Sequence, residues 1–415
     1  MKEFDMRKSL IQRILVYGFL VLLCWLNPMR GWGQNVEKTV DALVELGFEN
    51  VGFSETDSER VYIIQNTAYK LNGVGIGKAV DVVQENGMPD DKTCRIVVLD
   101  NNVPQISLVC YARSEADSEG SVSRRDWDVS YELGDSWKQA SKAKRKNSSL
   151  YKVDVVIYPE LSVKNVKVAQ IYEVLLNLNP TIEVSFWKGM KAEAQLIIPV
   201  INDFGMLYDQ VRMGMITLSQ TVRLPHNVFL TGAVGTFSNF RWGADLRAKY
   251  ILEFDERFSF EGRIGYTGAA RMKDWRWKVS KPERLMWNVA GNFYWPQFNT
   301  QFQLKYEKSV YDEKGVQVQM IRHFRHASIG FWGSKTWGYK DSGRFIGFLF
   351  QVALPPYKMK RRGYIPRVTT SSYMGLRYAG EKSGVPQTYK TQPWDNVARE
   401  NSFNPIFIKS ELLNY

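Results

Sequence analysis

Two long runs of alternating residues lie side by side in Arg241–Gly268, RWGADLRAKYILEFDERFSFEGRIGYTG. In the first run, the apolar positions are Trp242, Ala244, Leu246, Ala248, Tyr250, Leu252 and Phe254, and the polar ones include Asp245, Arg247, Lys249 and Glu253. A period of two is typical of a β-strand, whose successive side chains point to opposite faces. Strands average about five to six residues, and this alternation lasts more than twice as long. The segment therefore predicts a long hairpin whose two faces meet different media.

The same pattern fills the chain from Tyr151 onward. We expect strands at 151–158, 166–178, 181–188, 191–200, 211–221, 226–237, 241–254, 257–268, 284–295, 300–310, 315–324, 326–337, 344–353 and 371–379. Long antiparallel strands with aromatic residues at their ends are typical of an outer-membrane β-barrel, and we place Trp242, Tyr266, Trp287, Trp295 and Tyr306 in such girdles. A closed barrel is the form of β-sheet that can span a lipid bilayer, because it leaves no strand edge with unpaired backbone groups. A soluble β-sandwich or barrel is the alternative, and the strand length argues against it.

The N-terminus predicts export. Residues 1–13 carry four basic residues, an apolar run follows from Ile14 to Leu26, and Gly31 and Gly33 stand at positions −3 and −1 of a cleavage site. These features predict a secretory signal peptide, residues 1–33, cleaved after Gly33. An uncleaved anchor helix is the alternative, and lipidation at Cys24 is a further one, although Leu23 precedes it where a small residue is expected.

Between the signal peptide and the strand-rich part, residues 34–112 mix short helices and strands. We expect helices at 36–46 and 75–84 and strands at 49–53 and 60–66, which together predict a small periplasmic α+β domain. Residues 113–150 are polar and charged and are expected to form a linker or loop. The barrel is then expected to occupy residues 151–415. The fold class is mainly β: a transmembrane antiparallel barrel of about 12–14 strands with an N-terminal α+β domain.

Two cysteines remain after cleavage. Cys94 and Cys110 flank CRIVVLDNNVPQISLVC, which predicts two strands joined by a turn at Asp100–Asn102. The cysteines lie about equally far from the turn, so a cross-strand disulfide and two buried thiols are both consistent with the spacing.

The net charge is positive. The chain has a formal charge of +12, and residues 1–33 hold five basic and two acidic residues, so the remainder carries +9. This balance suits an anionic partner or lipid surface without identifying it. The basic stretch Lys358–Arg362 is expected in a loop at one mouth of the barrel, either binding anions or simply solvated.

No motif in the sequence predicts catalysis. GVGIGK (73–78) lacks the spacing of a phosphate-binding loop and is expected to form a tight turn before a helix. The pair His323 and His326 has a spacing that puts the two on opposite faces of a strand, so no metal site is expected. We therefore expect no enzymatic activity, no cofactor and no nucleic-acid partner.

Scattered patches of the chain resemble the YjbH-like family of Gram-negative outer-membrane proteins associated with exopolysaccharide or capsule production. The patches are GFENV, RVYIIQNTAY, FLTGAVGTF, GRIGYTG, IRHFRHASIGFWGSKT, VALPPYKMKRRGYIP and NPIFIKSELLNY. The resemblance implies a periplasmic α+β portion, an outer-membrane barrel and a role in moving or assembling surface polysaccharide, and it offers no catalytic residues. The chain is shorter than expected of a full member, and its signal peptide resembles those of Bacteroidetes.

Together these features predict a non-enzymatic barrel for exopolysaccharide or capsule export or assembly, working with other envelope proteins. Inward-facing cations would hold an acidic glycan in a polar basic lumen, and two aromatic residues would stack on sugar rings. The candidate residues are Arg247, Lys249, Arg263, Arg284, Lys305, Tyr294 and Trp332. The alternatives are a structural or secretion-associated outer-membrane barrel without transport activity, and a periplasmic β-rich protein that binds or modifies polysaccharide.

Overall fold

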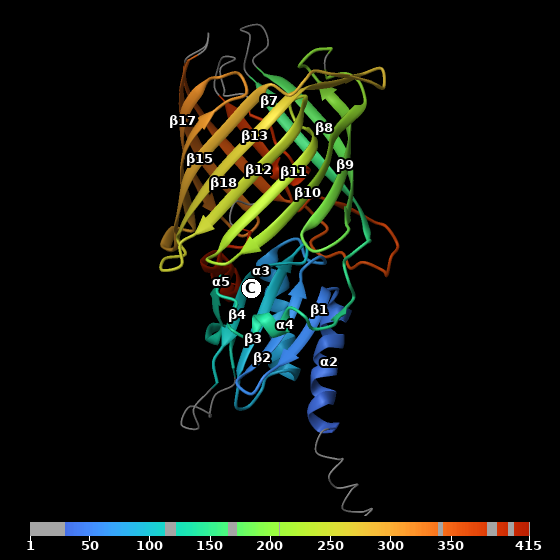
Figure 1. The fold of residues 1–415 in the computed structure, drawn as a ribbon, viewed down its shortest axis with the longest axis vertical. Helices are drawn as coiled ribbons and strands as arrows, with labels where there is room; N and C mark the ends of the chain where they lie inside the picture. The colour runs from blue at the N-terminus through green and yellow to red at the C-terminus, as the bar shows by residue number, and fades with distance from the viewer. Residues whose placement is uncertain are drawn as a thin grey trace, which may run out of the picture.

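A β-barrel stands on a small α+β domain in the computed structural model (Figure 1). The structure describes residues 30–112, 122–164, 172–206, 208–338, 343–379, 388–396 and 402–414. Most of the expected signal peptide, residues 1–33, lies outside these ranges, and only its last residues begin helix α2 (Arg30–Leu46). No helix in the described ranges is long and apolar enough to span a membrane. We call the end of the barrel beside the domain proximal and the opposite end distal.

The domain is built on a six-stranded sheet in the order β5-β4-β3-β2-β1-β6. Its elements are β1 (Glu49–Glu55), β2 (Glu59–Gln65), α3 (Asn72–Asn86), β3 (Thr93–Asp100), β4 (Val103–Cys110), β5 (Asp128–Ser130), α4 (Trp137–Ala140) and β6 (Arg145–Lys146). Helix α3 is the crossover between the parallel strands β2 and β3, whereas β3 and β4 form an antiparallel hairpin. Asn101 and Asn102 both have positive φ and make its turn, as the sequence predicts.

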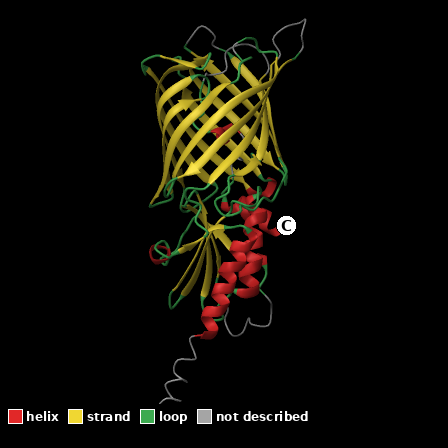
Figure 2. Cartoon of the chain, turned by 90° about the vertical axis from the view of Figure 1, so that its right-hand side faces the viewer, coloured by secondary structure: helices red, strands yellow, loops and turns green. Residues whose placement is uncertain are grey.

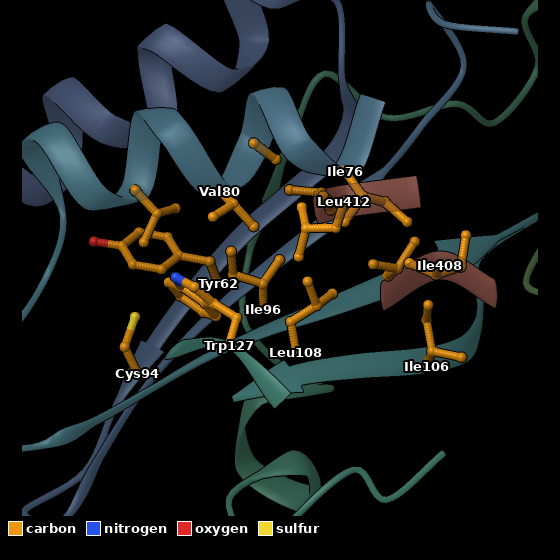
Figure 3. Packing of buried hydrophobic residues seen from close by; sticks show 14 of the residues in the cluster. Tyr62, Ile76, Val80, Cys94, Ile96, Ile106, Leu108, Trp127, Ile408 and Leu412 are labelled. Atoms are coloured by element: carbon orange, nitrogen blue, oxygen red, sulfur yellow. The ribbon is translucent and has the colours of Figure 1, made fainter. Parts of the chain in front are cut away.

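One face of this sheet carries the helices, and a dry core lies between them (Figures 2 and 3). Fully buried side chains come from α2, α3 and the central strands, among them Leu43, Ile76, Val80, Tyr62, Ile96 and Leu108. The other face is covered by the segment around α4, which packs Ala140 onto Val61, Ile63 and Val97. Strand β2 is buried along its whole length because both faces of the sheet are covered.

The expected boundary near residue 112 is wrong, because part of the predicted linker belongs to the domain. Strand β5 pairs with β4 at one edge of the sheet, and β6 pairs with β1 at the other. Trp127 is fully buried in the core that Figure 3 shows. Residues 113–121 lie outside the described ranges, so the correction concerns 122–150. A few buried residues among many charged ones are enough to fix this segment on the sheet.

The glycines of GVGIGK lie inside α3 and not in a turn before it. The side chain of Glu411 leaves no room for a Cβ at Gly73, which would lie 2.3 Å from the Glu411 Cβ, and the side chain of Asn66 crowds Gly75 in the same way. The glycines therefore let other segments approach the helix closely.

The barrel is a closed ring of thirteen strands, in agreement with the expected 12–14. The ring comprises β7 (Val153–Lys164), β8 (Glu173–Ser185), β9 (Met190–Asn202), β10 (Arg212–Leu224), β11 (Val228–Phe237), β12 (Arg241–Ile251), β13 (Phe258–Lys273), β15 (Arg284–Trp295), β16 (Thr300–Lys308), β17 (Lys314–His323), β18 (Ala327–Trp337), β19 (Arg344–Ala353) and β21 (Tyr373–Ala379). The expected strands 166–178 and 181–188 contribute to one strand, β8, which continues through Pro180.

Closure of an odd number of strands requires one parallel contact. All neighbours in the ring are antiparallel except β21 and β7, which meet at Leu376 and Leu161. Below this contact, the short strand β20 (Arg367–Thr370) pairs with β7, also in parallel. Bacterial single-chain barrels have an even number of strands, so this ring departs from their rule.

The alternation of the sequence distributes side chains between the exterior and the lumen. On β12 and β13, Leu246, Tyr250, Phe260, Ile264 and Tyr266 are exposed on the outside. Their neighbours Asp245, which is buried, and Arg263, whose side chain is 10% exposed, form an ion pair inside. Exposed apolar residues continue around the ring on the other long strands: Ile182, Val234, Val289, Leu304, Val318, Phe331 and Ile346. A continuous apolar exterior of this kind is suited to lipid and not to water.

The C-terminus departs from the barrel, contrary to the expectation that residues 151–415 are all barrel. Helix α5 (Pro405–Asn414) lies against α3 in the domain, beneath the ring (Figure 1). Ile408 and Leu412 are fully buried there in the core of the domain, in one cluster with Ile76, Ile96 and Trp127 (Figure 3). The backbone N–H of Gly73 donates to Glu411 Oε2 at 3.1 Å, at the close approach that the glycine permits. The domain is thus made from both ends of the chain.

Candidate functional site

A segment of the C-terminal chain lies inside the barrel. Strand β21 runs toward the distal end, and the described residues 388–396 then line the lumen on the way to α5 in the domain. This luminal segment includes the helical turn η4 (Pro393–Asn396), which is visible inside the ring in Figure 2. Near the distal end, Ser238 N donates to Lys390 O at 3.0 Å, and Lys390 N donates to Ser238 Oγ at 2.8 Å. The segment is therefore bonded to the barrel wall by its backbone.

Tyr389 anchors the luminal segment to β12 and β13. Its hydroxyl donates to Asp245 Oδ2 at 2.7 Å, and Asp245 also accepts from Arg263 Nε at 3.0 Å. The Tyr389 ring stacks on Phe237 with centroids 5.2 Å apart, and the Arg263 guanidinium lies 4.8 Å from its centroid. Tyr389 is 1% exposed, so its body fills part of the lumen while its polar tip is satisfied.

A second anchor joins Arg247 to Asp395. Both terminal nitrogens of Arg247 reach the carboxylate of Asp395 at 3.3 Å, one to each oxygen. The same carboxylate accepts from the backbone N–H groups of Thr391 and Gln392, which closes the turn η4. A bidentate pair of this kind fixes direction as well as distance.

The predicted luminal cations come together with carboxylates and do not make a basic lumen. Arg247 pairs with Asp395, Lys249 lies 3.7 Å from Glu261, Arg263 pairs with Asp245, and Lys305 lies 2.7 Å from Glu307. Arg284 is at the distal rim, half exposed, 3.5 Å from Asp312. Each positive charge has a neighbour that neutralises it, so the lumen around these residues is polar and balanced. Alternation in the sequence reveals the inward cations and, for Lys305, the partner Glu307 two positions along the same strand, but it does not reveal the partners that lie on other segments.

The two predicted aromatic residues face inward but only one lines open space. Tyr294 is buried at the proximal end of β15, where its hydroxyl bonds Asn299 at 2.8 Å, and its side chain borders the central cavity. Trp332 packs over Gly347 on the next strand, where a Cβ would lie 2.7 Å from the indole ring. Trp332 does not line the cavity, so it offers no stacking surface to a guest there.

A cavity of about 740 Å³ lies between the lumen and the domain. Its wall combines amide, hydroxyl and aromatic side chains from the barrel with residues of the domain and of the luminal segment. Representative residues are Asn292, Gln301, Tyr158, Lys70 and Trp394. Three buried polar atoms of residues that line it, Thr67 Oγ1, Arg263 Nη2 and Gln301 Oε1, have no hydrogen-bond partner among the described protein atoms. Such atoms are normally satisfied by water or a ligand, so this cavity is suited to a hydroxyl-rich guest.

The domain is fastened to the proximal end by a buried charge network. Glu49 is 1% exposed and its Oε1 contacts Lys152 Nζ at 2.8 Å and Arg361 Nε at 3.0 Å. Arg361 also pairs with Asp154, which in turn binds Arg367 at 2.9 Å. We call these five residues the junction network. It joins β1 of the domain to the strand β7 and to the loop after β19.

The basic stretch Lys358–Arg362 is therefore part of this junction and not a free basic loop. Arg361 belongs to the network, Lys360 Nζ donates to Glu45 O at 2.7 Å, and Lys358 lies 4.9 Å from the centroid of the Tyr69 ring. Arg362 is exposed and belongs neither to the junction network nor to a contact with the domain of this kind. Nearby, Lys70 Nζ donates to Thr370 Oγ1 at 2.8 Å, and burial together with the charge of Arg367 lowers the pKa of Lys70 to about 8.

The two cysteines face each other in register on β3 and β4, and the structure holds them as buried thiols. Burial and the neighbouring Cys110 raise the pKa of Cys94 above its usual range. A thiol that resists ionisation is unreactive. Figure 3 shows Cys94 at the edge of the domain core.

The described residues hold no cluster of His, Cys, Asp and Glu suited to a metal ion. The luminal residues that the sequence does not identify are Tyr389 and Asp395. The alternation in 241–254 gives Asp245 as a polar position, but it does not indicate that its carboxylate accepts from both Tyr389 and Arg263. Residues 388–396 show neither strand nor helix periodicity, so nothing in the sequence placed them in the lumen.

Comparison with known proteins does not identify a family for this chain. No protein-family model matches the chain, and no curated protein matches it. Among solved structures, the chain is similar to OmpTdeltaL8, a loop L8 deletion mutant of OmpT, an outer membrane protein of Vibrio cholerae. The identity is 6%, the match covers 48% of this chain and 85% of that chain, and the TM-score is 0.27. A likeness at this score carries no argument, so the account of the protein depends on its own geometry.

Proposed function

We propose that the protein is an outer-membrane barrel that is closed at rest and takes part, without enzymatic activity, in the export or assembly of an exopolysaccharide or capsule. The apolar exterior supports the membrane location, since lipid alone offers such a belt an apolar medium. The domain would lie in the periplasm, after removal of residues 1–33. The observation that carries the closed state is the luminal segment, bonded to the wall by Tyr389 and Asp395.

The polysaccharide is proposed from the resemblance to the YjbH-like family and from the chemistry of the cavity. Amide, hydroxyl and aromatic side chains are the groups that hold sugars by hydrogen bonds and stacking. The paired charges favour a glycan bound through many weak polar contacts over one held by free cations. An acidic glycan would fit this proposal by displacing the carboxylate partners, Asp395 first, because that residue is on the luminal segment and not on the barrel wall.

The alternative is a scaffold that holds other envelope proteins and conducts nothing. It is favoured by one observation: the luminal segment lies in the pore, bonded to the wall, and the junction network fastens the domain against the proximal end. Opening would require breaking Arg247–Asp395 and Tyr389–Asp245 at least. A carrier must open during its cycle, whereas a scaffold need not.

Gene deletion and complementation test the proposal. We expect deletion to lower surface polysaccharide and the wild-type gene to restore it; unchanged polysaccharide would refute the role. A variant with Ser238→Cys and Lys390→Cys locks the luminal segment to the wall by a disulfide, and each single variant is a control. If the locked variant fails to restore polysaccharide until reductant is added, the protein must open. If it restores polysaccharide while locked, the scaffold role is correct.

A further inference from the structure

Three cations lie on the outward face of the barrel wall, at its distal end. Lys314 begins β17, Lys335 is two residues from the end of β18, and Arg344 begins β19. All three are exposed, and from each of them burial alternates with period two toward the middle of its strand. They share this face with Phe331 and Ile346, which are exposed apolar residues of the barrel exterior. We call the three cations the distal basic patch.

The register brings the cations of the distal basic patch close together. Lys335 is directly opposite Arg344, and Lys314 is its diagonal neighbour on the other side. Side chains directly opposite each other start about 5 Å apart and diagonal ones about 7–8 Å apart, and like charges so placed destabilise a strand pair. In the part of the chain that the structure describes, no carboxylate forms an ion pair with these three cations, whereas Lys308, opposite Lys314, pairs with Asp312 at 2.7 Å. The patch therefore lacks the neutralising partners that the luminal cations have.

The wall next to the distal basic patch leaves room for an acyl chain. Gly333 lies two residues from Lys335 toward the middle of β18, and a Cβ built there would meet a single atom within 4 Å, at 3.8 Å. On the neighbouring strands, Val318 and Ile346 are directly opposite this glycine and are 53% and 75% exposed. The glycine therefore leaves a gap in the apolar wall between two protruding side chains, adjacent to the cations.

An aromatic pair lies beside the distal basic patch. Trp337 is directly opposite Lys314, and its ring stacks on that of Tyr306 with centroids 6.1 Å apart. Tryptophan and tyrosine on the outer face of a membrane barrel lie at the level of the lipid head groups. The patch is therefore at the depth at which the phosphates of the surrounding lipids are found.

We propose that the distal basic patch binds the phosphate group of a lipid in the leaflet around the distal end, with one acyl chain of that lipid lying over Gly333. Lysine and arginine make charge-assisted hydrogen bonds to phosphate oxygens, and clustered cations attract anionic lipids. The apolar gap beside the cations favours a lipid over a soluble anion, which has no chain to fill it. The site rests on the membrane location proposed above and is independent of the polysaccharide.

Three cations on the opposite face provide a matched control at the same end of the barrel. Strand β13 runs past its ring neighbours and pairs with β14 (Arg276–Val279), and Arg271, Lys273 and Arg276 are exposed there. Arg271 and Lys273 continue the luminal face of β13, and Arg276 is directly opposite Lys273 on the same face. These cations are also distal and exposed, but they face away from the lipid.

The test uses the full chain in detergent micelles, with bis-phosphorylated lipid A as the probe and dephosphorylated lipid A as its comparison. Lipid retained after gel filtration is measured by native mass spectrometry. The control variant replaces the three luminal-face cations of β13 and β14 by glutamine. The patch variant combines Lys314→Gln, Lys335→Gln and Arg344→Gln. Heat-modifiable gel migration verifies that the wild type and both variants are folded barrels.

A second pair of variants tests the position of the acyl chain. Gly333→Leu fills the gap beside the patch. Gly262→Leu puts the same side chain on β13, at a position opposite the exposed Val289 where a Cβ meets no atom within 4 Å. Gly333→Leu should lower the retention of phosphorylated lipid, and Gly262→Leu should leave it unchanged. Unchanged retention in both variants would refute the contact between the chain and Gly333.

We expect the patch variant to retain at least about tenfold less phosphorylated lipid than the wild type, with the control variant unchanged. Equal retention by the patch variant and the wild type would overturn the proposal. An equal loss in the control variant, or retention that ignores dephosphorylation, would overturn it too, and in these cases a folded wild-type barrel leaves the membrane location standing. A wild type that does not migrate as a heat-modifiable barrel would overturn the membrane location and the lipid site together.

Discussion

The α+β domain and the barrel arrange the same kinds of side chain in opposite ways. In the domain, Leu43, Ile96 and Leu412 are fully buried, and the charges that are buried with them are paired, as Arg95 is with Glu59. In the barrel, Leu246 and Ile264 are about half exposed outside, while the ion pair of Asp245 and Arg263 lies within. The domain turns charged side chains toward water and buries apolar ones, whereas the barrel turns apolar side chains toward lipid and keeps charged ones inside. The two parts therefore cannot be distinguished by composition, but they can be distinguished by whether the apolar side chains point inward or outward.

The C-terminal chain passes from the polar lumen of the barrel to the apolar core of the domain. Tyr389, Gln392 and Asp395 offer polar groups where the chain passes the lumen, and Ile408 and Leu412 are apolar where it enters the domain. The change in chemistry follows the change in surroundings within a single segment. Substitutions in the domain, in the barrel wall and in the luminal segment test whether the interiors of the two parts differ in this way.

The largest effect is expected at the junction network. Arg361→Ala removes one partner of a buried network and leaves Glu49 and Asp154 undercompensated, which costs about 3–5 kcal/mol. We expect the domain to undock, so that protease cleaves between residues 146 and 153 without dissociating the barrel. Arg362→Ala is the control, because Arg362 is exposed. Equal protease resistance in both variants would show that the network does not hold the two parts together.

The next effect concerns the C-terminal helix. Leu412→Ala should destabilise the domain by about 2–5 kcal/mol, since the residue is fully buried in its core. Leu413→Ala, one position along and 47% exposed, should change stability little. Thermal unfolding of the two variants measures the difference. If both leucines behaved alike, α5 would not be part of the core.

A charged side chain introduced on the exterior of the barrel should impair assembly in the membrane more than a change on the luminal face. Leu246→Arg puts a cation in the middle of the outward face of β12, at a cost of about 2–4 kcal/mol in a bilayer. Arg247→Leu, on the luminal face, should still assemble and lose the bond to Asp395 instead. The folded fraction of each is measured by heat-modifiable migration. Better assembly of Leu246→Arg than of Arg247→Leu would reverse the assignment of the two faces.

These three sites also show how far the sequence predicts the structure. Alternation around Leu246 correctly predicts the strands and their two faces, because burial on one face imposes period two. It does not predict the junction network, whose members Glu49, Lys152 and Arg361 are far apart in the chain. Leu412 belongs to a short helix that carries no amphipathic signal of its own, since it is buried against an already formed domain. The luminal segment has no periodicity, because specific partners and not a repeating surface fix it.

A smaller effect is expected from Tyr389→Phe. The change removes the hydrogen bond to Asp245 and leaves the Arg263–Asp245 pair intact, so we expect a loss of about 0.5–1.5 kcal/mol in the attachment of the luminal segment. The rate of disulfide formation in a background of Ser238→Cys and Lys390→Cys reports how often the segment is attached to the wall, and Tyr389→Phe should lower that rate. An unchanged trapping rate would assign the attachment to the stacked ring and the backbone alone.

The smallest effect is a dependence of docking on pH. Lys70 has a pKa lowered to about 8 in the docked domain, so between pH 8 and the ordinary lysine pKa of about 10.4 the undocked form binds more protons. Docking should therefore strengthen as pH rises through this window. Resistance of the junction to protease measures it, and Lys70→Met should abolish the rise. A junction that weakens over the same range would contradict the assignment.

Single-channel recording of the full chain in a planar bilayer tests the closed barrel most directly. We predict no stable current steps from the wild type, because the luminal segment lies in the pore and the domain covers its proximal end. The variant with Tyr389→Ala and Asp395→Ala, which loses both side-chain anchors, should show frequent openings. Steady conductance from the wild type, equal to that of the variant, would contradict the account.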